Sequence, residues 1–293
     1  MSEILTGTIL KGIGGFYYVL TADGVTHTLR AQSKLRREHL KPMVGDKVEF
    51  EAGTDEGWLV KILERKNSLL RPPVANIDEA VLTMSASVPP ADTLLIDRLL
   101  LFSRQKGIDA CVVINKSETD GENARILAEQ YGKCGARVFC VSAESGEGIA
   151  ELRQYLRGKI HAFAGQSGVG KSSLINALYG TQLETGVISA RIERGKNTTR
   201  SCCLIPVEGG GGVLDTPGFS LYESELVQPE KLQEYYEEFR PYAECRFSPC
   251  CHVSEPDCGV KKALREGLIP AERYERYKLL LDEMKERWKQ RYD

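Results

Sequence analysis

Residues 165–173 read Gly-Gln-Ser-Gly-Val-Gly-Lys-Ser-Ser, which matches the phosphate-binding loop pattern G-x-x-x-x-G-K-[ST]. The apolar run 160–164 before them predicts a buried strand, and residues 171–179 after them predict a helix. In that setting backbone N–H groups can surround phosphate oxygens, and the helix dipole favours their negative charge. The alternative is a glycine-rich turn with an incidental Lys-Ser pair, which explains neither the strand nor the helix.

The residue types of this loop fit contact with a nucleotide. Lys171 would reach the β- and γ-phosphates, and the hydroxyl of Ser172 would bind Mg²⁺. The glycines let the backbone curl so that its N–H groups point inward. The expected nucleotide contacts are Gly165, Gln166, Ser167, Gly168, Val169, Gly170, Lys171, Ser172 and Ser173.

The composition is that of a globular protein, with 42% hydrophobic and 27% charged residues among 293. This length suits two or three domains. The formal net charge of −2 gives no overall attraction to nucleic acid, so any RNA contact must come from local patches. No apolar run is long enough to cross a bilayer, and Met1-Ser2-Glu3 opens no signal peptide. We therefore expect a cytoplasmic protein without membrane contact.

Residues 1–70 predict a small β-barrel. Five short apolar runs are separated by glycine-rich or polar turns, which favours a five-stranded barrel compatible with an OB-fold. Such folds often bind single-stranded nucleic acid. Cations between Arg30 and Lys41 fall in an expected loop, where a solvated surface is the simpler interpretation. The expected strands are residues 4–10, 16–20, 26–29, 47–51 and 58–63.

Strands and helices alternate through residues 71–226, as in a doubly wound, mostly parallel sheet. Ligands bind such sheets at the carboxyl ends of the strands. After one predicted strand comes Asn115-Lys116-Ser117-Glu118, which resembles the guanine motif N-K-x-D with Glu for Asp. A carboxylate there accepts hydrogen bonds from N1–H and the 2-amino group of guanine, a pair that adenine lacks. After the next strand, Ser142-Ala143 is similar to the S-A-K motif that contacts the guanine oxygen.

Two further motifs follow the phosphate-binding loop. Residues 195–200 (Gly-Lys-Asn-Thr-Thr-Arg) are a candidate for the first switch, in which we expect Thr198 to lie near the nucleotide and Thr199 to bind Mg²⁺ with Ser172. Residues 213–218 (Val-Leu-Asp-Thr-Pro-Gly) resemble the D-x-x-G motif. There Asp215 would hold Mg²⁺, and the Gly218 amide would sense the γ-phosphate.

The order of these motifs is unusual. In Ras-like GTPases the phosphate-binding loop comes first and the guanine motifs last, whereas here the guanine motifs come first. Opening the same sheet at a different loop and joining the old ends gives this order and keeps every spatial neighbour. The sequence therefore predicts a circularly permuted P-loop GTPase domain.

The C-terminal part carries a metal-binding pattern, Cys-x4-Cys-x-His-x5-Cys. Three thiolates and one imidazole can close a tetrahedron around a structural Zn²⁺, and the alternative is a set of buried or reactive cysteines. The expected ligands are Cys245, Cys250, His252 and Cys258. The other cysteines outside this segment are expected to be buried small side chains: Cys111, Cys134, Cys140, Cys202 and Cys203.

Residues 271–292 predict a charged helix with an apolar stripe at helical spacing, which favours core packing. Its cations, Arg273 and Arg276 among them, are expected to point outward, where they could meet RNA phosphates. Residues 230–239 predict one further helix, and Arg71-Pro72-Pro73 predicts a linker.

Taken together, the rotated motif order, the loop block at 165–176, D-T-P-G-F at 215–219 and the cysteine pattern resemble the ribosome small-subunit-dependent GTPase A family. The resemblance covers essentially the whole chain. It implies an OB-fold over 1–70, a circularly permuted GTPase over 71–226 and a zinc-binding, helical domain over 227–293. It also implies GTP/GDP, Mg²⁺ and one zinc ion, a monomer, and a role in late maturation of the 30S subunit through contact with its 16S rRNA. Cys251 does not fit the family's ligand pattern.

Two departures from related enzymes concern catalysis. Phe219 stands where Ras-type enzymes carry a glutamine that orients water, and Asn197 stands where the family usually has histidine. Asparagine can position water but is no general base near neutral pH. We therefore expect slow hydrolysis by the protein alone, and acceleration by the subunit of roughly 10³–10⁵, by analogy with GTPase-activating partners.

Three other functions remain open from the residues. A P-loop ATPase or small-molecule kinase would share the loop, but the Asn115–Glu118 motif argues against adenine. A nucleic-acid module could use the nucleotide as a passive switch with negligible catalysis. A 50S assembly factor could have the same motif order.

Overall fold

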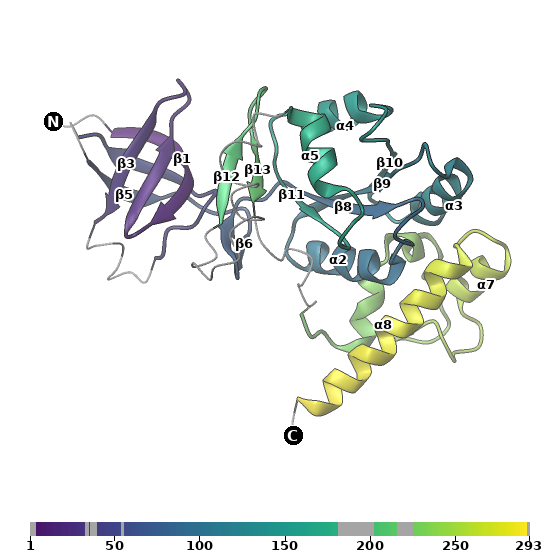
Figure 1. Cartoon of the computed structure of the whole chain (residues 1–293). Helices are drawn as coiled ribbons and strands as arrows, with labels where there is room; N and C mark the ends of the chain where they lie inside the picture. Colours follow the sequence, from purple (N-terminus) through teal and green to yellow (C-terminus); the bar gives the residue numbers. More distant parts are fainter. Residues whose placement is uncertain are drawn as a thin grey trace.

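A computed structural model of the chain describes residues 4–32, 35, 40–53, 56–180, 202–215 and 225–291. It shows the predicted barrel, central sheet and helical C-terminal part side by side (Figure 1). None of the described helices combines the length and the apolar character needed to cross a membrane.

The N-terminal strands close into a five-stranded barrel, as predicted. β1 pairs antiparallel with both β2 and β4, β3 pairs parallel with β5, and β4 pairs antiparallel with β5. Alternate residues face inward because side chains alternate along a strand. The strands are β1 (Ile4–Ile13), β2 (Phe16–Leu20), β3 (Thr26–Ala31), β4 (Lys47–Glu51) and β5 (Gly57–Ile62). Their core is formed by Ile9, Val19, Leu29, Leu35, Val48, Phe50 and Leu59.

The expected linker at residues 71–73 is instead part of a hairpin. β6 (Ser68–Leu70) and β7 (Pro73–Ala75) pair antiparallel, with Leu70 opposite Pro73. The prolines suggested a linker, but Pro73 sits at the first position of a strand, where a missing N–H costs least. Val74 is fully buried and belongs to the core of the central domain.

The central sheet has the predicted parallel strands in the order β10-β9-β8-β11-β13, with β12 antiparallel at the edge. The central strands β8, β9 and β11 are buried on both faces along nearly their whole length, which explains their nearly continuous apolar sequence. The strands of this sheet are β8 (Glu79–Ser85), β9 (Asp109–Asn115), β10 (Arg137–Cys140), β11 (Ile160–Ala164), β12 (Cys203–Pro206) and β13 (Gly212–Asp215).

Helices cover both faces of this sheet (Figure 1). α2 (Thr93–Gln105) and α3 (Gly121–Tyr131) pack on one face, and α4 (Ile149–Leu156) and α5 (Lys171–Tyr179) on the other. Asp92 and Asp120 cap the first two helices by accepting hydrogen bonds from Leu95 N and Asn123 N. Cys140, expected to be buried, is exposed because it faces outward at the edge strand β10.

The sheet continues into the barrel. β12 pairs with β1 at one position, where Lys11 lies opposite Cys203. Within the described part of the chain, the strands of barrel and central domain therefore form one continuous sheet of 11 strands.

The C-terminal part contains η3 (Pro229–Tyr235), η4 (Glu237–Tyr242), α7 (Gly259–Arg265) and α8 (Ala271–Gln290). The single helix expected at residues 230–239 is thus two short 3₁₀ helices. Tyr236 between them has an extended backbone, which lets its ring stack on Phe239 at 5.2 Å. As predicted, the apolar stripe of α8 is buried: Tyr274, Tyr277, Leu280, Leu281 and Met284.

Arg273 and Arg276 were expected to face outward, and this prediction is wrong. Both are buried against Asp97 of α2, with ion pairs of 2.5 Å from Arg273 and 2.6 Å from Arg276. Arg273 also pairs with Glu238 of η4 at 2.7 Å, and Tyr131 donates to Asp97 at 2.9 Å. The helical period places these arginines at the edge of the apolar stripe, and buried acids on other elements draw them inward. This network joins α8 to the central domain.

Replacing Arg273 with methionine should lower the free energy of unfolding by about 3–5 kcal/mol, because Glu238 and Asp97 would lose a buried cation. Arg98→Met is the matched control, since its pair with Glu283 has side chains 36% and 42% exposed. That change should cost less than about 1 kcal/mol. Urea unfolding at pH 7 measures both, and equal losses would contradict the argument.

Candidate nucleotide site and metal centre

The phosphate-binding loop lies between β11 and α5, at the carboxyl edge of the sheet, as the sequence predicted. Two of its glycines are required by close packing. A Cβ at Gly165 (φ 139°) would lie 2.0 Å from Thr83 O, and one at Gly170 (φ 92°) would lie 2.4 Å from Asn115 Nδ2. The loop is therefore fitted against β8 and against the guanine motif.

Lys171 opens α5 and folds back over the loop. Its Nζ donates to Gly165 O at 2.8 Å and to Gln166 O at 2.7 Å. Burial lowers the pKa of this ammonium group. A partly desolvated cation held over a ring of backbone groups is suited to binding phosphate oxygens. Ser172 and Ser173 follow it at the exposed start of the helix.

Asn115, at the end of β9, ties the guanine motifs to the phosphate loop. Its Nδ2 donates to Val169 O at 2.9 Å, and its Oδ1 accepts from Ala143 N at 3.1 Å. Asn115 is buried, so both bonds are shielded from water. One side chain thus links the three sequence motifs that we had identified separately.

Lys116 extends the same link. Its backbone is left-handed (φ 63°), and its Nζ donates to Gly168 O at 3.0 Å and to Val88 O. Val88 belongs to the loop between β8 and α2, which the sequence analysis had not assigned to the site. The sequence cannot reveal this contact, because Val88 accepts the hydrogen bond of Lys116 through its backbone carbonyl, which every residue type has.

Glu118 lies beside Ser142, the first residue of the second guanine motif. A hydrogen bond from the Ser142 side chain lowers the pKa of Glu118. The carboxylate therefore stays ionised near neutral pH, where it can accept hydrogen bonds from a base edge. Ser117 completes the turn, with its N–H bonded to Val141 O at 3.2 Å.

Asp215 ends β13 at the same edge of the sheet. β13 runs parallel to β11, with His161 opposite Val213, so both strands deliver their carboxyl ends to the phosphate loop. Cys203 of the neighbouring strand places its Sγ 4.0 Å from Asp215 Oδ2. The other predicted switch residues lie outside the described residues: Asn197, Thr198, Thr199, Gly218 and Phe219.

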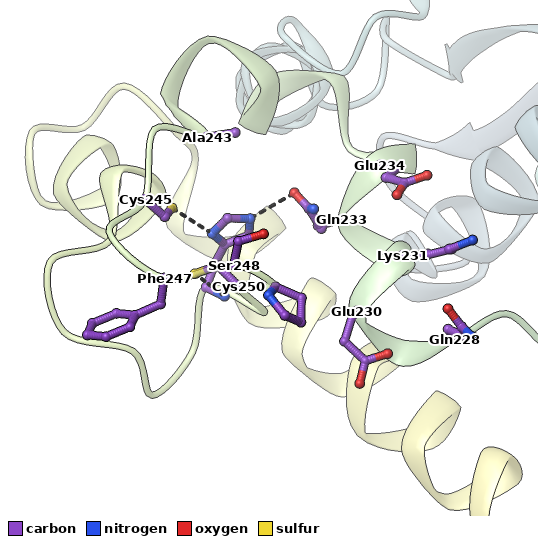
Figure 2. A pocket seen from close by; sticks show the side chains of 12 residues that line it. Gln228, Glu230, Lys231, Gln233, Glu234, Ala243, Cys245, Phe247, Ser248 and Cys250 are labelled. Carbon is purple, nitrogen blue, oxygen red and sulfur yellow. Dashed lines mark hydrogen bonds between the residues drawn. The ribbon is translucent and has the colours of Figure 1, made fainter.

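The four predicted zinc ligands come together on the loop between η4 and α7, with their ligand atoms within 4.8 Å of one another. Figure 2 labels two of them, Cys245 and Cys250. The Sγ of Cys245 lies 3.8 Å from that of Cys258, which lies 4.0 Å from that of Cys250. His252 Nδ1 lies 3.5 Å from Cys245 Sγ and 3.3 Å from Cys258 Sγ. When ligands surround a zinc ion tetrahedrally at ordinary bond lengths, two sulfurs lie about 3.8 Å apart and a sulfur and a nitrogen about 3.6 Å apart. The residues present therefore fit a structural zinc ion.

The surroundings of the cluster support this assignment. His252 N lies 3.4 Å from Cys250 Sγ and Lys261 N lies 3.5 Å from Cys258 Sγ, so backbone donors face the sulfurs. Burial raises the pKa of the Cys250 thiol to about 12, and a bound zinc ion would supply the charge that holds a thiolate there. The hydroxyl of Tyr274 on α8 supports the loop by donating to His252 O at 2.6 Å.

Cys251 lies outside the cluster, as predicted. Its N–H donates to Glu255 Oε1 at 2.7 Å, and its carbonyl accepts from the hydroxyl of Tyr277 at 2.9 Å. The backbone of Cys251 thus holds the loop in place while its thiol is not one of the four ligands.

Neighbouring cysteines provide a matched test of the metal centre. Cys250→Ser should remove the bound zinc and lower the melting temperature, because a hydroxyl is a poor zinc ligand and the loop has little core of its own. Cys251→Ser should keep one zinc per chain. Metal content by atomic emission and thermal unfolding measure the two effects. Zinc lost from both variants, or kept in both, would contradict the assignment.

Comparison with known proteins agrees with this geometry. The family model described as "RsgA GTPase" matches residues 62–225, and that of the "RsgA N-terminal domain" matches residues 6–59. A protein of Caldanaerobacter subterraneus subsp. tengcongensis named "Small ribosomal subunit biogenesis GTPase RsgA" is 44% identical over 99% of both chains. One of the same name from Geobacillus sp. strain WCH70 is 43% identical over 98% of this chain and 99% of its own.

Two solved structures are also similar. YjeQ from Thermotoga maritima has a TM-score of 0.84 at 35% identity, covering 96% of this chain and 99% of its own. YloQ, described as a circularly permuted GTPase, has a TM-score of 0.82 at 34% identity, covering 97% and 96%. The permuted motif order, the shared fold and the match along nearly the whole length lead to one conclusion: the chain belongs to the RsgA GTPase family.

Proposed function

We propose that this protein hydrolyses GTP and acts in biogenesis of the small ribosomal subunit, with hydrolysis stimulated by that subunit. The observation that supports nucleotide binding most directly is the pair of hydrogen bonds made by the Asn115 side chain, which holds the phosphate loop and the base motifs together at one edge of the sheet. The names of the relatives, which are small ribosomal subunit biogenesis GTPases, support the biological part.

The position of each residue indicates which part of the nucleotide it would bind. Lys171 and the loop amides would bind the phosphates, and Ser172 and Asp215 would hold Mg²⁺ together with Thr199. Asn115, Lys116, Ser117 and Glu118, with Ser142 and Ala143, would bind guanine. Asn197 would position water, and Gly218 would sense the γ-phosphate. Asn197 is no general base near neutral pH, which supports slow hydrolysis in the absence of a partner.

We also propose three domains, over 1–70, 71–226 and 227–293, in a cytoplasmic monomer that contacts 16S rRNA and no membrane. The outer face of the barrel supports the RNA contact. There Arg30 lies over the ring of Phe16 and Lys11 over that of Tyr18, each at 4.4 Å. Trp58, opposite Arg30 in the sheet, is 49% exposed. Aromatic rings beside cations suit the stacking of unpaired bases near a phosphate backbone.

Separated ribosomal subunits test this proposal. With a non-hydrolysable GTP analogue, the protein should co-sediment with 30S and not with 50S subunits, and 30S should accelerate its GTP turnover. Trp58→Ala should weaken 30S binding roughly tenfold, since a stacked base contributes about 1–3 kcal/mol. Val25→Ala, at an exposed turn of the barrel, is the control. Binding to 50S instead, or turnover unchanged by 30S, would overturn the assignment.

Guanine recognition can be tested at Glu118. Glu118→Gln should weaken GDP binding at least tenfold, because the amide offers a donor where guanine presents its 2-amino donor. The same variant should gain affinity for xanthosine diphosphate, which has a carbonyl at that position. Calorimetric titration with both nucleotides measures this change in base specificity. A variant that keeps its preference for GDP would show that Glu118 does not read the base.

A further inference from the structure

The zinc ligand His252 has a hydrogen-bond partner from a separate segment of the chain. Its Nδ1 faces the sulfurs of Cys245 and Cys258, while its Nε2 lies 2.9 Å from Oε1 of Gln233 on η3 (Figure 2). A neutral imidazole has one N–H and one lone pair. If Nε2 donates its proton to an amide oxygen, the lone pair is on Nδ1, where a metal ion needs it.

The position of Gln233 is set by the buried core of the C-terminal part. The neighbouring Leu232 is fully buried, and Gln233 O accepts from Tyr236 N at 3.1 Å as η3 ends. Leu232 and Tyr236 belong to the core shared with α8, and Cys250 and Cys258 belong to the same core, so η3 and the ligand-bearing loop are held in one packed unit. The side chain is thereby presented to the imidazole from a fixed support.

The neighbouring carboxylates do not replace Gln233 as the hydrogen-bond partner of His252. Glu230 and Glu234 lie on the same short helix and line the same cavity of about 400 Å³ beside the metal centre. The partner of His252 Nε2 is Gln233, and in Figure 2 the carboxylates of Glu230 and Glu234 point away from the Gln233 amide. The contact therefore depends on one amide and not on general polarity around the histidine.

We propose that Gln233 is a positioning residue of the zinc site, which holds His252 in the Nε2–H form and directs Nδ1 to the metal. The contact acts in both directions, because the metal-held imidazole in turn fixes η3. η3 begins at Pro229, eleven residues after Gly218 of the D-x-x-G motif, so the metal centre secures the segment by which the chain leaves the GTPase domain. Nothing in the ligand spacing C-x4-C-x-H-x5-C points to this residue.

Three variants test the role of Gln233 in zinc affinity. Gln233→Leu removes the acceptor and should weaken zinc binding by roughly 10–100-fold, the usual effect of losing such a partner. Gln233→Glu keeps an acceptor oxygen and should restore most of the affinity. Gln228→Leu makes the same change at a neighbouring exposed glutamine that lines the same cavity. It should leave the affinity unchanged.

Competition of the full-length protein with a chromogenic zinc chelator measures these affinities. A Leu variant that binds zinc as tightly as the unaltered protein would overturn the proposal. Equal losses in the Leu and Glu variants would also overturn it, because packing and not the acceptor would then matter.

A second measurement needs no variant. In zinc-loaded protein labelled with ¹⁵N-histidine, the ring of His252 should carry its proton on Nε2 and the metal on Nδ1. Long-range ¹H–¹⁵N correlation spectra distinguish the two nitrogens. A proton on Nδ1 or a metal-bound Nε2 would refute the proposed geometry even if Gln233→Leu failed to fold.

Discussion

The site depends above all on the two hydrogen bonds of the Asn115 side chain. They join loops that follow β9, β10 and β11, three strands delivered to one edge of the sheet by their parallel arrangement. An amide is suited to this position because it donates and accepts at once, and a buried carboxylate could not donate to Val169 O. The close approach of Gly170 to the same amide leaves no room for a side chain. The guanine motif and the phosphate loop are therefore one structural unit, although the chain separates them by some fifty residues.

This unit explains why the rotated motif order is compatible with the fold. The contacts join the carboxyl ends of β9, β10 and β11, which lie at one edge of the sheet, and do not depend on where the chain begins. What the permutation changes is the position of the ends. The chain enters the domain at β8 and leaves after β13, so its outer modules attach close to the predicted switches. Cys203, three residues after the end of the first predicted switch, opens β12 and pairs with Lys11 of the barrel strand β1. Glu225, the first described residue after the other, is held at both backbone groups by the side chain of Gln105 on α2.

The sequence was sufficient for the features that depend on local pattern. Apolar periodicity predicted the barrel strands and the alternating central elements, and motif spacing predicted the zinc cluster, whose ligand atoms lie at the distances a tetrahedron requires.

The sequence was insufficient where a residue's contact partner is distant along the chain. Arg273 and Arg276 read as surface cations because nothing near them shows that Asp97 and Glu238 are buried opposite. Residues 230–239 read as one helix because the break at Tyr236 follows from aromatic packing against α8. Val88 contributes only a carbonyl, which no residue type reveals.

The C-terminal part is likewise held by contacts between residues that are distant along the chain. A buried charge network is weak evidence of net stability, since desolvation offsets much of the attraction, but it favours one arrangement over others because any mispaired charge is costly. The network around Asp97 therefore fixes how α8 lies on α2, and α8 in turn supports the zinc loop through the hydroxyls of Tyr274 and Tyr277. η3 is packed against the same helices and contacts His252 through Gln233. The metal centre is thus connected to the GTPase domain by two routes, one through α8 and one through η3. Because of the second route, a displacement of η3 would have to strain the contact at His252 or carry the zinc loop with it.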